Sequence, residues 1–90
     1  MKKLIVNVTN EDIRTGRKEC VSACPVAKAI RRAGIERPKV FGSILEYGRA
    51  YRQPGSMKKE ATLPKIASRF VRAFDLGQQV RPFRFELKVA

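Results

Sequence analysis

The sequence predicts an α+β domain in which two helices pack on one face of a small antiparallel sheet. Three patterns predict it. Residues 4–9 alternate and are rich in β-branched side chains, residues 62–77 repeat with the period of a helix, and residues 82–89 alternate strictly between apolar and charged. With the elements between them, the order is β-α-β-β-α-β, which is that of the ferredoxin-like motif.

The first strand and the turn after it are expected within residues 4–16. Leu4, Val6 and Val8 fall on one face of the strand. Thr9 precedes Asp12 by three residues, which resembles a capping box. We therefore expect a short helical turn or an ordered loop, ended by Gly16.

The first full helix is predicted over residues 22–34, because Pro25 stands near its start and Gly34 at its end. Its expected buried stripe is Val26, Ala29, Ile30 and Ala33, and its exposed basic residues are Lys28, Arg31 and Arg32.

Two short strands joined as a hairpin are predicted between residues 39 and 52, where glycines separate short apolar and aromatic pieces. Residues 53–61 combine turn-forming residues with no apolar period. They are expected to form a surface loop, the part of the chain most prone to move.

The second helix is predicted to be capped by Thr62, with Pro64 in its first turn and Gly77 at its end. Its apolar stripe is Leu63, Ile66, Ala67, Phe70, Val71 and Phe74, and Lys65, Arg69 and Arg72 form a basic stripe on the opposite face. The last strand then turns Phe83, Phe85, Leu87 and Val89 inward.

Length and composition indicate a single folded domain over residues 1–90, with 43% hydrophobic and 31% charged residues. No apolar run approaches the roughly 20 residues that cross a bilayer. Asn7 interrupts the apolar stretch near the N-terminus, so a secretory signal is not expected. We expect a soluble, cytoplasmic protein that does not engage membranes.

The charge is the most unusual property of the chain. Twenty basic residues stand against eight acidic ones, giving a formal net charge of +12. Such a field attracts phosphate backbones and acidic protein surfaces. At the hairpin, Arg49, Tyr51 and Arg52 mix guanidinium and aromatic groups, which suits phosphate contact with base stacking. The predicted binding residues are Lys28, Arg31, Arg32, Arg49, Tyr51, Arg52, Lys58, Lys59, Lys65, Arg69 and Arg72.

Two alternatives stay open for this basic surface. Its side chains can simply solvate the helix faces, or they can bind an acidic protein. For a protein partner, Tyr47 and Tyr51 are candidate anchors, although both also suit the core of the hairpin.

Cys20 and Cys24 are expected to be thiols, because the chain shows no export signal. They could serve redox chemistry or metal binding at a helix N-terminus. A zinc site within one chain is excluded, since it needs four ligands and the sequence has two cysteines and no histidine. We favour two small buried thiols, and the sequence leaves pairing or metal binding across a dimer open.

The sequence predicts a protein that is not an enzyme and needs no cofactor. Without histidine, neither a Ser/His nor a Cys/His pair can form. The chain also has no glycine-rich phosphate loop of the P-loop or dinucleotide type.

Four segments together resemble small proteins encoded by tailed bacteriophages and prophages. They are Asp12-Ile13 with Gly16, residues 24–34 (CPVAKAIRRAG), residues 70–77 (FVRAFDLG) and residues 80–87 (VRPFRFEL). The chain departs from that pattern in the loop from Pro54 to Glu60 and in an extra residue between the cysteines.

The resemblance implies a viral protein that acts stoichiometrically inside a bacterial host cell. The first hypothesis is a basic, nucleic-acid-binding accessory protein that engages DNA, RNA or a bacterial ribonucleoprotein. The alternative is a host-defence inhibitor of the anti-CRISPR type that binds a protein complex. Either could be a monomer or a small homo-oligomer.

Overall fold

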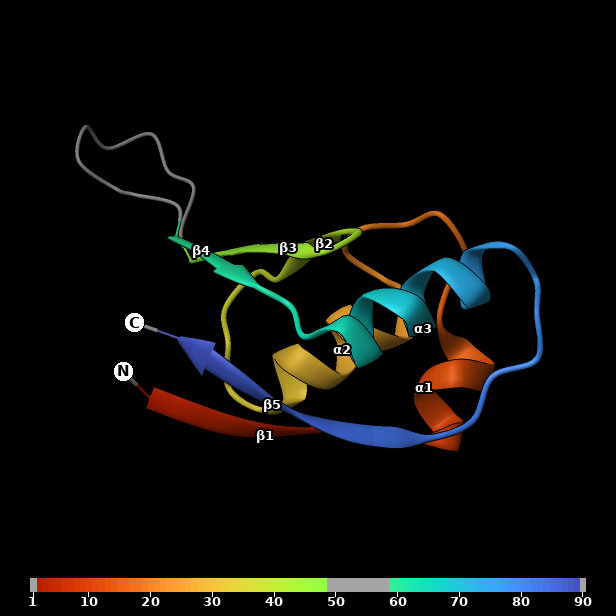
Figure 1. The fold of residues 1–90 in the computed structure, drawn as a ribbon, viewed down its shortest axis with the longest axis horizontal. Helices are drawn as coiled ribbons and strands as arrows, with labels where there is room; N and C mark the ends of the chain where they lie inside the picture. Colours follow the sequence, from red (N-terminus) through yellow and green to blue (C-terminus); the bar gives the residue numbers. More distant parts are fainter. Residues whose placement is uncertain (1, 49–58, 90) are drawn as a thin grey trace.

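The computed structural model describes residues 2–48 and 59–89, which form three helices and two antiparallel sheets (Figure 1). The predicted α+β class is confirmed. The single sheet of a ferredoxin-like arrangement is not formed, because the described strands divide into a two-stranded and a three-stranded sheet.

The two-stranded sheet pairs β1 (Lys2–Val8) with β5 (Phe83–Val89). Its register runs from Lys2 opposite Val89 to Val8 opposite Phe83. The predicted alternation is confirmed: Val6 and Val8 of β1 are buried, together with Phe85, Leu87 and Val89 of β5.

The three-stranded sheet contains the predicted hairpin, formed by β2 (Lys39–Phe41) and β3 (Ile44–Tyr47). The connection is the two-residue turn Gly42-Ser43, and the φ of +62° at Gly42 suits the first central position of a type II′ turn.

The other edge of β3 pairs with β4 (Lys59–Thr62). The expected loop over 53–61 is therefore wrong for residues 59–61, and its remainder lies outside the described residues. A short, polar edge strand has no apolar alternation to reveal it, because what forms it is backbone pairing with an existing strand.

The helix α2 (Pro25–Arg32) lies between the two sheets (Figure 1) and contacts both β1 and β2. Its buried residues are Pro25, Val26, Ala27, Ala29 and Ile30. These residues lie on more than one face of the helix. A helix with apolar residues on several faces is stable only when other elements pack against each of those faces. This explains why the strands form two layers around α2 rather than one sheet beneath it.

The helix α3 (Lys65–Asp75) begins later than predicted. Pro64 is its N-cap residue, and Thr62, the expected cap, ends β4 instead. The apolar stripe is otherwise buried, except for Ile66, which is 53% exposed at the edge of the stripe in the first turn. The ring of Phe70 lies 4.7 Å from that of Phe83, which packs α3 against β5.

Candidate polyanion-binding surface

Three predicted binding residues come together on the exposed side of α3. Lys65, Arg69 and Arg72 are all exposed, and their spacing of four and three residues spans about 10 Å of helix. We call them the α3 stripe. Within the described part of the chain, their side chains make no hydrogen bond or ion pair. Their charged groups therefore face solvent in the described fold.

The basic residues of α2 are placed differently. Lys28 is half-buried, and the Arg31 guanidinium donates to the Ser22 carbonyl at 2.9 Å. That bond ties the end of α2 to the loop that precedes it, so part of the hydrogen-bonding capacity of Arg31 is used inside the fold.

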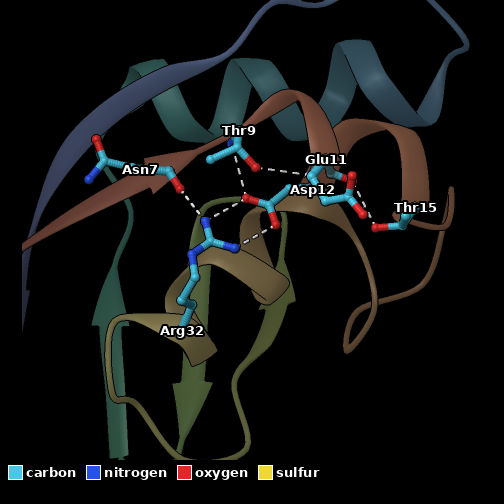
Figure 2. A network of polar contacts seen from close by, with 6 residues as sticks. All are labelled: Asn7, Thr9, Glu11, Asp12, Thr15 and Arg32. Carbon is cyan, nitrogen blue, oxygen red and sulfur yellow. Dashed lines mark hydrogen bonds and ion pairs between the residues drawn. The ribbon is translucent and has the colours of Figure 1, made fainter.

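Arg32 is a structural residue in this fold (Figure 2). Its guanidinium donates to both carboxylate oxygens of Asp12, at 2.8 and 2.7 Å, and to the Asn7 carbonyl at 2.6 Å. One side chain thus connects α2 with β1 and with α1 (Asn10–Thr15). The predicted binding role of Arg32 is therefore wrong, because its guanidinium is occupied inside the fold.

Asp12, the acceptor of these bonds, is 1% exposed. It also forms the predicted capping box: its carboxylate accepts from the Thr9 N–H at 2.9 Å, and the Thr9 hydroxyl accepts from the Asp12 N–H at 3.2 Å. Burial by itself raises the pKa of Asp12, but the hydrogen bonds from Arg32 and Thr9 together hold that pKa below its usual value. Asp12 is therefore a paired carboxylate inside the fold.

Of the remaining predicted residues, some lie on the three-stranded sheet and the others fall within residues 49–58, which the structure does not describe. Lys59 is exposed on β4. Tyr47 is only 7% exposed and belongs to the core, so it is no anchor for a protein partner. Four predicted residues lie outside the described residues: Arg49, Tyr51, Arg52 and Lys58.

A second basic face, which the sequence hypothesis did not include, lies on the outer side of the β1–β5 sheet. Lys3 stands opposite Lys88, and Arg84 opposite Asn7, with all four residues exposed. The alternation of residues 83–89 already placed Arg84 and Lys88 outward. The alternation did not show that these residues would lie beside Lys3, because β1 and β5 are far apart in the sequence and only their pairing brings the cations together.

The two cysteines are free and occupy different environments, so the expectation that both are buried is wrong for Cys20. Cys24 is buried as the N-cap of α2, where its sulfur accepts from the Ala27 N–H at 3.4 Å, and burial raises the pKa of its thiol. Cys20 is partly exposed, and hydrogen bonding with Ser22 lowers the pKa of its thiol. In the described part of the chain, no group of three or more potential metal ligands occurs.

These environments predict a clear order of alkylation. Near pH 8, Cys20 should react with iodoacetamide at least about ten times faster than Cys24, because it is more exposed and ionises more readily. Mass spectrometry of native and urea-unfolded protein measures both rates. Equal rates in the native protein would contradict this assignment, and the variant Cys20→Ser should retain only the slow site.

Comparison with known proteins gives no assignment: no family model, no curated protein and no solved structure matches the chain. In residues 2–48 and 59–89, no helix is long and apolar enough to span a membrane.

Proposed function

We propose that this chain is a non-catalytic binding protein whose basic surface engages nucleic acid, or a nucleic-acid-containing complex, in the cytoplasm of a bacterial host. The observation that carries the proposal is the α3 stripe: three exposed cations on one helix face without partners in the described fold. The resemblance to small phage proteins supports the same cellular setting.

The charge around the stripe supports an anionic partner. Asp75, on the same helix, accepts a hydrogen bond from the Glu19 N–H at 2.9 Å, so one of its carboxylate oxygens already has a partner. The first turn of α3 contains no acidic residue that could neutralise Lys65. Lys65 stands at the positive end of the helix dipole, where a cation is unfavourable unless an anion compensates it. A phosphate backbone offers several anions along about 10 Å, and binding it releases counterions.

The proposal predicts a specific loss of salt dependence. The triple variant Lys65→Gln, Arg69→Gln, Arg72→Gln should bind a labelled oligonucleotide at least about tenfold more weakly at low salt. The slope of log K against log salt should fall by about two to three units, one for each lost phosphate contact. Fluorescence anisotropy at several salt concentrations measures both quantities.

The β1–β5 face provides a control with the same change in net charge. The variant Lys3→Gln, Arg84→Gln, Lys88→Gln should bind much more like the unmodified protein. Equal losses in the two triple variants would show that binding follows net charge and not the stripe. Absence of binding to DNA and RNA at low salt would reject nucleic acid as the partner.

A stoichiometric inhibitor of a host machine is the second candidate, and Ile66 favours it. This side chain is 53% exposed beside Lys65, and an exposed aliphatic residue among cations can anchor an acidic protein surface. Capture from nuclease-treated bacterial lysate separates the candidates. A single protein retained in stoichiometric amount after nuclease treatment, and lost in Ile66→Asp, supports the inhibitor.

A further inference from the structure

A pocket of about 420 Å³ lies beside the α3 stripe. Its walls come from the loop around Cys20, from the β2–β3 hairpin and from the C-terminal half of α3. Arg72 belongs both to the stripe and to the wall of this pocket, which we call the α3 pocket. Arg72 therefore joins the pocket to the stripe.

The α3 pocket contains an exposed aromatic ring. Phe41 is 46% exposed at the hairpin, whereas Phe70, Phe74 and Phe85 are buried in the core. Leu76, which is 63% exposed, lines the same pocket from the end of α3. Burial of such side chains is favourable, and proteins that bind single strands combine a basic track with exposed rings on which bases stack.

The charges in the pocket suit a base better than a phosphate. Glu19 and Asp75 line it, and the Glu19 N–H donates to the Asp75 carboxylate. Carboxylates repel phosphate and accept hydrogen bonds from the exocyclic amino groups of bases. Cations along the stripe and carboxylates in the pocket match a nucleotide whose phosphate lies outside and whose base points inward.

We infer that this surface binds single-stranded nucleic acid, with one unstacked base in the α3 pocket against Phe41 and the flanking phosphates on the α3 stripe. This inference rests on the proposed function and specifies its ligand. A base paired within a duplex cannot enter the pocket without leaving its stack, so duplex should bind only through its phosphates.

The test compares three probes of equal length, about 12 nucleotides: a cytosine-rich single strand, the corresponding duplex, and a single strand in which the central nucleotides are abasic. The single strand should bind about tenfold more tightly than either of the others. Phe41→Ala should remove that advantage and leave duplex and abasic binding unchanged. The matched control is Ile44→Ala, which removes the exposed residue paired with Phe41 but does not line the pocket.

A direct readout is available because the chain contains no tryptophan. In Phe41→Trp, the indole fluorescence should be quenched by the single strand and not by the abasic strand, and circular dichroism checks that each variant is folded. Equal affinity for all three probes, or full single-strand affinity in Phe41→Ala, overturns the inference while the proposed function stands. Failure to bind any of the probes at low salt, whether made of DNA or of RNA, rejects nucleic acid as the partner and with it the basis of the inference.

Discussion

Replacement of Arg32 by alanine is expected to lower the free energy of unfolding by about 2–3 kcal/mol, because its partner Asp12 is buried although Arg32 itself is half-exposed. The substitution leaves the buried Asp12 carboxylate with the Thr9 N–H as its remaining strong donor, and it frees the Asn7 carbonyl. A buried charge that loses its partner costs far more than the pair contributes when intact. Urea denaturation followed by circular dichroism measures the difference.

The effect should also depend on pH. In the unmodified protein the lowered pKa of Asp12 stabilises the fold above about pH 4, and this contribution is lost as pH falls through the folded-state pKa. In Arg32→Ala, loss of the guanidinium raises the pKa of Asp12 relative to the unmodified protein, so the variant loses less stability when Asp12 is protonated. The stability difference should therefore narrow between pH 7 and pH 3.

Arg31→Ala is the matched control, because it removes one hydrogen bond to a backbone carbonyl at the neighbouring position. It should cost about 1 kcal/mol with little dependence on pH. Equal losses in the two variants at pH 7, or a constant loss in Arg32→Ala across the pH range, would contradict the role given to the Asp12–Arg32 pair.

Replacement of Gly16 by alanine is expected to cost about 2–3 kcal/mol, for a steric reason. A Cβ atom at this position would lie 2.7 Å from the Asp12 carbonyl oxygen and 2.7 Å from the ring of Pro25. Both neighbours are fixed, one by the backbone of α1 and the other by the start of α2. The two helices would have to move apart, and overpacking of this kind is destabilising.

Gly34→Ala separates this clash from the effect of glycine on backbone conformation. Gly34 has a φ of +109°, and a Cβ atom added there would meet no other atom within 4 Å. Alanine at this position therefore meets conformational strain alone, about 1 kcal/mol. Thermal denaturation of both variants is the measurement. A Gly16→Ala variant no less stable than Gly34→Ala would contradict the close approach of α1 and α2.

The local elements were predictable because their signals are local. Alternation located β1 and β5, and the spacing of Thr9 and Asp12 indicated the cap of α1. What could not be predicted is which strands share a sheet. That depends on α2 being buried from two sides, and on β4 pairing through backbone groups that carry no residue signature.

The candidate surface was predictable only in part, for a similar reason. Periodicity places Lys65, Arg69 and Arg72 on one face, and α3 presents them there. It also places Arg32 outward, but it cannot show that Asp12, twenty residues earlier, lies within hydrogen-bonding distance. The exposure of Phe41 depends likewise on contacts between elements.

The pairing of β1 with β5 also determines when this chain can fold. The hydrogen-bonding partners of β1 are about eighty residues away, so closing this sheet costs more chain entropy than forming the β2–β3 hairpin. A ribosome-bound chain that lacks β5 would leave Val6 and Val8 without the strand that completes their layer. The native core should therefore assemble only after β5 has emerged from the ribosome, as one cooperative event.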